Sequence, residues 1–193
     1  NLLKEQQGEI SLPGTTHMQH AMPSSVALWC EGFLEAFEDA TEGLQNAKRR
    51  SNKNPLGSAA GYGTPGLPID RSITTAKLNF TETQVPVTAA QLSRGKAEAH
   101  ILFELALVMQ DLGRLASDLL LYYTQEYSFI DLANEVTTGS SIMPQKRNPD
   151  PLEYLRGKSG ITMGNLISMM TILKGLPLSY FKDLQDDKEL VFN

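Results

Sequence analysis

The stretch from about Thr88 to Glu126 constrains the fold of this chain more than any other, because no proline interrupts it and apolar residues recur along it at helical spacing. A single helix over this stretch would be about 55 Å long at 1.5 Å per residue. A chain of 193 residues cannot by itself bury a helix of that length. We therefore expect an elongated helical bundle whose long helix is partly covered by other subunits.

Three further helical blocks are expected, whereas strand signals are scarce. One block spans about 24–50, where Ser24 or Ser25 can cap the first exposed amides. Another spans about 149–173 and carries a methionine-rich run that is better suited to packing than to binding a ligand. The last begins near Asp183. This pattern predicts an all-α fold, a long-helix bundle built from a single helical domain.

Composition narrows the class of protein. Hydrophobic residues make up 41% of the chain, enough for a core, and the net charge of −5 argues against a nucleic acid or an anionic membrane as partner. Cys30 is the only cysteine, so we expect a reducing, cytoplasmic location and a buried structural thiol. No signal peptide or membrane-spanning run is visible. The start at Asn1 and the end at Asn193 suggest that residues 1–193 are a fragment of a longer protein.

Two other features are interpreted from composition alone. Residues 51–72 are rich in glycine, proline and serine, and both a functional loop and a flexible surface connector fit this stretch. The acidic pairs Glu38–Asp39 and Asp186–Asp187 are expected to be solvated helix faces.

A polar loop at 137–149 carries more chemistry than a connection between helices needs. It combines hydroxyl groups, a glycine, two cations and an amide: Thr137, Thr138, Gly139, Ser140, Ser141, Lys146, Arg147 and Asn148. Such a loop can bind a carboxylate and hold a hydroxyl group at a reacting carbon, although a polar surface loop has a similar composition.

The order of residues in this loop is more specific than its composition. Residues 139–149 read Gly-Ser-Ser-Ile-Met-Pro-Gln-Lys-Arg-Asn-Pro and resemble the GSSxMPxKxNP signature of the fumarase/aspartase superfamily. Residues 15–23 are similar to that family's Thr-His-x-Gln segment, and 177–189 to its Tyr-x-Lys-Asp-Leu-Gln-x-Asp-Lys-Glu segment. Gln145 and the continuation to Glu153 resemble the argininosuccinate lyase branch of the superfamily.

The resemblance implies an enzyme that cleaves a C–N bond by anti elimination and releases fumarate, without a cofactor or a metal ion. The family's catalytic serine falls on Ser140, with Ser141 as the rival, and Lys146 together with loop amides would stabilise the alkoxide. His17 matches the catalytic histidine of the family, and Glu153 matches the carboxylate that orients it.

The same resemblance assigns residues that contact the substrate. Gln19 and Lys146 are expected near the carboxylates on the fumarate side. Further substrate contacts fall on Thr16, Asn148, Tyr180, Gln185 and Lys188. His20 stands where many relatives carry arginine, so a substrate contact and a surface position both remain open. His100 is expected to be structural.

The resemblance also implies a homotetramer in which three subunits build each active site. A third active-site segment, which precedes the Thr-His segment in relatives, is absent here, so the chain alone is expected to lack activity. The expected substrate is argininosuccinate, cleaved to arginine and fumarate. An adenylosuccinate lyase-like member of the superfamily and a non-catalytic structural relative are the alternatives.

Overall fold

The computed structural model describes residues 1–192, so the expected chain end at residue 193 lies outside the described residues. The contacts divide the chain into two compact units. The first comprises Asn1–Thr41 with Leu107–Gly160, and the second comprises Glu42–Ala106 with Ile161–Asn193. Helices dominate and the strands are short, which confirms the predicted all-α class. Three long helices pass from one unit to the other: α2 (Val26–Ser51), α5 (Lys96–Tyr122) and α6 (Asp150–Leu173).

Two of these helices begin where the sequence predicted. The side chain of Ser25 caps α2, because its Oγ accepts a hydrogen bond from the backbone N–H of Leu28 at 3.2 Å. Pro149 directly precedes α6, and its carbonyl accepts from the N–H of Leu152 at 3.0 Å. The helices predicted over about 24–50 and 149–173 are therefore confirmed.

The prediction of one continuous helix over 88–126 is wrong. The structure has a short helix α4 (Thr88–Leu92), a break, and then α5. Gly95 causes the break with a φ of +79°, a conformation that residues with a side chain rarely adopt. The side chain of Leu173 packs against the face of Gly95 where a Cβ atom would lie. With 27 residues, α5 is about 40 Å long.

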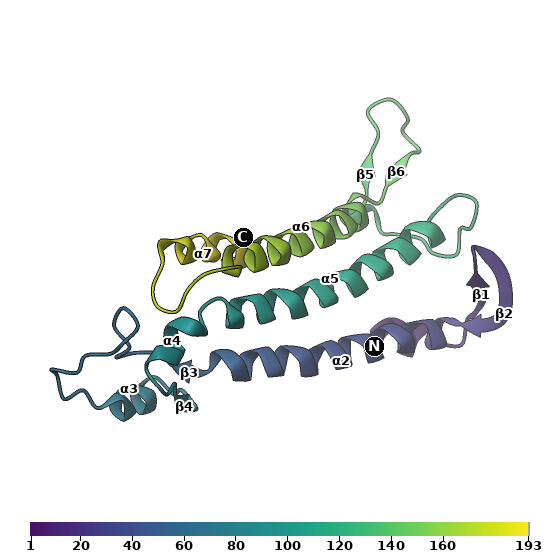
Figure 1. Ribbon diagram of the computed structural model, residues 1–193. Coiled ribbons are helices and arrows are strands. Elements are labelled where there is room, and N and C mark those ends of the chain that lie inside the picture. Colours follow the sequence, from purple (N-terminus) through teal and green to yellow (C-terminus); the bar gives the residue numbers. More distant parts are fainter. Residues whose placement is uncertain (193) are drawn as a thin grey trace. The chain divides into compact units, whose positions relative to one another are not determined.

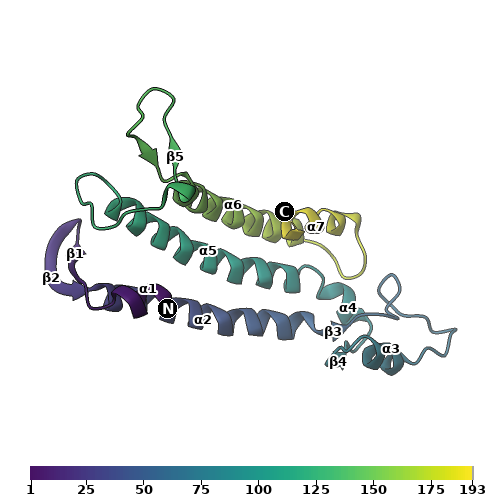
Figure 2. The same ribbon diagram turned by 180° about the vertical axis from the view of Figure 1, so that it is seen from behind.

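The first unit begins with elements that the sequence did not predict. Helix α1 (Leu2–Gln7) lies beside α2, as Figure 2 shows, and an ion pair of 2.7 Å joins Lys4 to Glu31. A hairpin of β1 (Ser11–Thr16) and β2 (Gln19–Ser25) leads into α2. Aromatic rings then pack between α2, α5 and the residues after α5, where the indole N–H of Trp29 donates to Asp118 at 2.9 Å.

Cys30 lies on α2 and is a free thiol, but it is partly exposed and so less buried than predicted. Burial is still the main influence on this group and raises the pKa of the Cys30 thiol. A raised pKa lowers the thiolate fraction, which agrees with an unreactive, structural role.

The core of the second unit lies between α5 and α6. Ala99, Leu102 and Met169 are buried there, with Leu166, Leu173, Leu190 and Val191 packed against them. Met169 is completely buried, which confirms a packing role for at least this member of the methionine-rich run. The predicted last helical block is also present, as a short 3-10 helix η2 (Lys182–Gln185) followed by α7 (Asp187–Phe192).

The connector after α2 is organised around one side chain. Asn54 is completely buried at the end of β3 (Lys53–Asn54), which pairs in parallel with β4 (Glu82–Thr83). Its amide bonds to α3 (Arg71–Lys77), a helix capped by Asp70. Hydrogen bonds from Ser72 lower the pKa of the Asp70 carboxyl. These contacts fix the two ends of 51–72, while most residues between them are exposed, so a functional loop and a surface connector both remain possible interpretations.

None of the helices within residues 1–192 combines the length and the apolar character that crossing a membrane requires.

Candidate active site

Ser140 lies at the start of an exposed loop between β5 (Thr138–Gly139) and β6 (Arg147–Asn148), a small hairpin that leads into α6 (Figure 1). The Ser140 Oγ accepts hydrogen bonds from the backbone N–H groups of Ile142, at 3.3 Å, and Met143, at 3.2 Å. The same two dipoles would stabilise negative charge on this oxygen. Ser141 is exposed, and no hydrogen bond to its side chain is found within residues 1–192.

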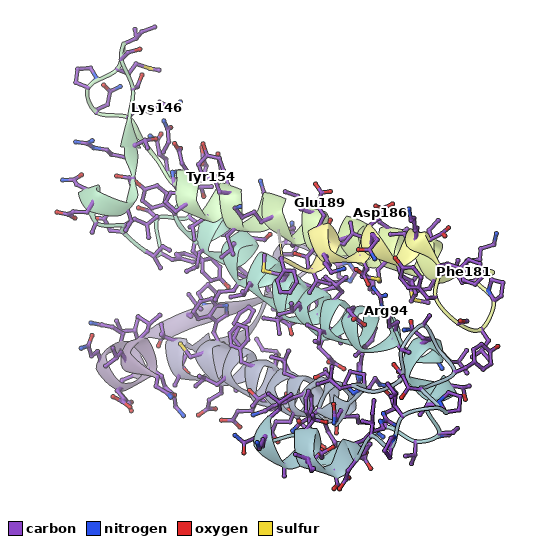
Figure 3. The ribbon with its side chains drawn as sticks, turned by 90° about the vertical axis from the view of Figure 1, so that its left-hand side faces the viewer. Arg94, Lys146, Tyr154, Phe181, Asp186 and Glu189 are labelled. Carbon is purple, nitrogen blue, oxygen red and sulfur yellow. The ribbon has the colours of Figure 1, made fainter. Side chains whose placement is uncertain are left out.

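Lys146 is close to Ser140 in sequence, but its ammonium group makes no ion pair within residues 1–192. Lys146 is exposed, and its backbone N–H donates to the carbonyl of Met143 at 3.1 Å, which closes the loop. Its ammonium group has no ion pair within residues 1–192, and Figure 3 shows Lys146 on the hairpin. Thr138 donates to Asp150 at 2.6 Å and so ties the base of the hairpin to the first turn of α6.

His17 lies at the tip of the β1–β2 hairpin. Thr16 pairs with Gln19, so His17 and Met18 form a two-residue turn, with φ values of +55° and +62°. Two-residue turns with positive φ at both positions match the twist of a hairpin but usually require glycine or asparagine. The turn therefore holds His17 in a strained conformation, in which its imidazole ring is exposed.

The structure does not bring the three candidate catalytic groups into contact. His17, Ser140 and Glu153 belong to the first unit, but no hydrogen bond or ion pair joins any two of them within the described residues. Glu153 is exposed on the first turn of α6. Its role in orienting His17 therefore stays a prediction, as do the roles of Thr16, Gln19, Asn148 and Ser141.

The other two histidines differ in their surroundings. His20 is exposed on β2, and neither of its two predicted roles is tested. His100 on α5 accepts a hydrogen bond from Arg50 at 3.1 Å and lies 3.2 Å from the carboxylate of the buried Glu104. This chain of contacts gives His100 the structural position that the sequence predicted.

In the second unit, three of the predicted substrate-binding residues form one hydrogen-bonded group. The amide of Gln185 donates to the hydroxyl oxygen of Tyr180 at 2.7 Å, and the ammonium of Lys188 donates to the other end of the Gln185 amide at 3.4 Å. All three side chains remain exposed. These three side chains thus lie together in the second unit, and their role in substrate binding stays a prediction.

Arg94 supports this group and was missed by the sequence analysis. Its guanidinium donates to the carbonyl of Leu184 at 2.7 Å, pairs with Asp187 at 3.4 Å and lies 6.0 Å from the centre of the Tyr180 ring. The expectation that Asp187 is a solvated surface residue is wrong, because only 3% of it is exposed. The acidic neighbours of Asp187 in the sequence suggested that its side chain is exposed to solvent. Arg94, the cation that permits its burial, lies 93 residues away in the sequence. Asp186, Glu38 and Asp39 are exposed, as predicted.

Comparison with known proteins places the chain in a family. Residues 3–164 match the model of a protein family described as Lyase, and the chain belongs to this family. It is 43% identical over 182 residues, 94% of the chain, to the argininosuccinate lyase of a Nitratiruptor species. It is also 42% identical over 189 residues, 98% of the chain, to the argininosuccinate lyase of Bacteroides thetaiotaomicron. The chain spans 39% and 42% of the lengths of these relatives.

Solved structures confirm the expected fold. A crystal structure of EDDS lyase in complex with formate superposes with a TM-score of 0.86 at 29% identity, covering 95% of this chain and 37% of the other. A class II fumarase from Schistosoma mansoni superposes with a TM-score of 0.76 at 18% identity, covering 100% of this chain and 46% of the other. The chain therefore has the helical fold of the fumarase/aspartase superfamily.

Proposed function

We propose that the protein containing this chain cleaves argininosuccinate to arginine and fumarate, a step of arginine biosynthesis. The observation that carries the proposal is the pair of backbone N–H groups that donate to the Ser140 Oγ. A hydroxyl group needs such donors to act as a base at neutral pH. The similarity to argininosuccinate lyases over nearly the whole chain supports the choice of substrate.

In the proposed reaction, the Ser140 alkoxide removes a proton from the carbon next to a substrate carboxylate. The electron pair of that C–H bond first spreads into the carboxylate. It then forms the double bond of fumarate while the C–N bond breaks on the opposite face and the departing nitrogen takes a proton. Removing one donor of this type from an active site typically costs about 10²–10³ in rate. Lys146 adds a cation within the same loop.

The remaining predicted residues have distinct roles in this proposal. His17 takes part in proton transfer, with Glu153 as its hydrogen-bond partner from another subunit. Gln19 and Lys146 lie near the carboxylates on the fumarate side, and Thr16, Asn148 and Ser141 contact the substrate. The group formed by Tyr180, Gln185 and Lys188 binds the rest of the substrate, and its mutual hydrogen bonds support this assignment. The reaction requires no cofactor and no metal ion.

We propose further that the active protein is a cytoplasmic homotetramer with shared active sites. Several large apolar residues of α6 are exposed in the single chain, including Ile161 at 60% and Ile167 at 64%, and a neighbouring subunit would bury them. The absence of any hydrogen bond between His17 and Glu153 within the described residues fits a site completed by another copy.

The test of the reaction uses the full-length parent protein, with fumarate release followed by ultraviolet absorbance. Argininosuccinate should release fumarate, whereas adenylosuccinate and EDDS should not. Release from adenylosuccinate alone would contradict the proposed substrate, and release from none of the three would favour a non-catalytic relative. A folded Ser140→Ala variant should lose at least about 10³-fold in kcat, because the base is gone. Ser141→Ala is the comparison variant. It keeps the base, so its kcat should fall much less than that of Ser140→Ala. The reverse result would assign the base to Ser141.

The test of the shared site is a mixing experiment. Inactive His17→Asn and Ser140→Ala variants of the parent protein are unfolded together and refolded as mixed oligomers. Activity should return, because some sites combine an intact His17 from one subunit with an intact Ser140 from another. If the mixed oligomers have the size of a tetramer but activity does not return, His17 and Ser140 of each site come from the same subunit.

A further inference from the structure

Arg94 is the one cation of the second unit that contacts the predicted substrate-binding segment from outside it, within the residues that the structure describes. It lies between α4 and α5, next to the left-handed Gly95, and its side chain is 25% exposed. Figure 3 shows Arg94 beside the segment that carries Phe181, Asp186 and Glu189. The guanidinium has one strong contact with the backbone of that segment, the hydrogen bond of 2.7 Å to the Leu184 carbonyl.

The second contact of Arg94 is with a buried carboxylate. The side chain of Asp187 is 4% exposed, and its Oδ2 lies 3.4 Å from the Arg94 guanidinium. The other carboxylate oxygen accepts no hydrogen bond within residues 1–192, and its ion pair with the exposed Lys188 is longer, at 3.8 Å. A buried carboxylate is strongly destabilising when its partner is removed, so Asp187 depends on Arg94 to stay in place.

These contacts surround the hydrogen-bonded group described above. Leu184 and Asp187 lie on either side of Gln185, and Lys188 directly follows Asp187. The Arg94 guanidinium also lies over the ring of Tyr180, at 6.0 Å from its centre, where a cation is attracted to the aromatic face. Arg94 therefore contacts the backbone just before Gln185, the Asp187 carboxylate just after it and the ring of Tyr180 at the same time.

We propose that Arg94 is a positioning residue that fixes Tyr180, Gln185 and Lys188 for substrate binding by anchoring Leu184 and Asp187. The inference rests on the proposed function of that group. Arg94 itself acts through the segment and does not touch the substrate. Loss of the anchor should therefore weaken substrate binding, while the chemistry at Ser140 and His17, which belong to the first unit, proceeds as before.

The experiment compares variants of the full-length parent protein with argininosuccinate as substrate. Arg94→Gln and Asp187→Asn should each raise KM at least about tenfold and change kcat less than about threefold. The double variant should raise KM no further than the worse single variant, because both remove the same anchor. Lys96→Gln removes a cation two residues away whose side chain makes no hydrogen bond or ion pair within residues 1–192, and it should leave KM unchanged.

An unchanged KM in Arg94→Gln would overturn the proposal. A raised KM in Arg94→Gln together with an unchanged KM in Asp187→Asn would also overturn it, because that result would indicate that Arg94 contacts the substrate directly. If Arg94→Gln does not fold, Arg94→Lys replaces it. Lysine cannot reach both Leu184 and Asp187 with the same geometry, so KM should still rise, and an unchanged KM would overturn the anchor. A wild-type parent without activity on argininosuccinate would instead refute the proposed function.

Discussion

Replacing Asn54 by alanine should destabilise the second unit more than any other polar truncation in the connector. The Asn54 Nδ2 faces three acceptors, which are the carbonyl of Arg71 at 3.2 Å and the hydroxyl oxygens of Thr74, at 2.8 Å, and Thr75, at 2.9 Å. Its Oδ1 accepts from the backbone N–H of Leu56 at 3.0 Å. One fully buried side chain thus joins β3, α3 and the start of the connector.

The magnitude follows from what each partner can still do after the substitution. Both threonine hydroxyls already donate to the Arg71 carbonyl, at 3.0 and 2.9 Å, and keep those bonds. The substitution removes the hydrogen bond that the N–H of Leu56 donates to Asn54. It also removes the two hydrogen bonds that the two amide protons of Asn54 can donate. Three hydrogen bonds at a net contribution of about 0.5–1.5 kcal/mol each give an expected loss of about 2–4 kcal/mol.

Urea denaturation of the purified protein, wild type and variants, measures this loss as a change in the free energy of unfolding. Asn52→Ala is the matched control, because no hydrogen bond of the Asn52 side chain is found within residues 1–192, and it should change stability by less than about 0.5 kcal/mol. A loss below about 1 kcal/mol for Asn54→Ala, or equal losses for the two variants, would refute the reasoning.

Three further predictions concern the backbone, the thiol and the histidine of this chain. Gly95→Ala should destabilise by about 2–4 kcal/mol in urea denaturation, because alanine disfavours φ +79° and its Cβ would overlap Leu173. Gly157→Ala, whose Cβ would meet nothing within 4 Å, should not destabilise, and equal losses would contradict the argument. Cys30 should react with iodoacetamide at about pH 8 more slowly in the folded protein than in urea, since burial raises its pKa and the thiolate forms only at higher pH; equal rates would contradict this. His100 should carry its proton on Nε2, because Nδ1 accepts from Arg50, and nitrogen NMR showing the Nδ1–H form would contradict the assigned chain of contacts.

The helices were predictable where local signals and burial agree. A serine cap and a preceding proline mark the starts of α2 and α6, so both were found within a few residues. The break between α4 and α5 was missed because a helical pattern tolerates an isolated glycine, and only the packing of Leu173 against Gly95 decides its conformation. The β1–β2 hairpin was missed because its polar residues do not alternate with apolar ones.

The candidate site was predictable only through the resemblance. Nothing in the composition of 137–149 distinguishes Ser140 from Ser141, whereas the folded loop does, by directing two backbone amides at one of them. Asp187 was wrongly predicted to be exposed, and Arg94 was not identified, because their ion pair forms only when two distant segments meet in the fold. A cation directly before a helix-breaking glycine was the only local signal that Arg94 offered.

The source of the two N–H groups on Ser140 has one more consequence. Both donors come from residues two and three positions after the serine, so they belong to the same turn as the hydroxyl that accepts their hydrogen bonds. The turn would therefore carry these two dipoles with it in any movement of the hairpin. In the proposed reaction, such a movement would change the distance between the Ser140 oxygen and the substrate carbon but would not remove the two dipoles, so access and reactivity could evolve independently.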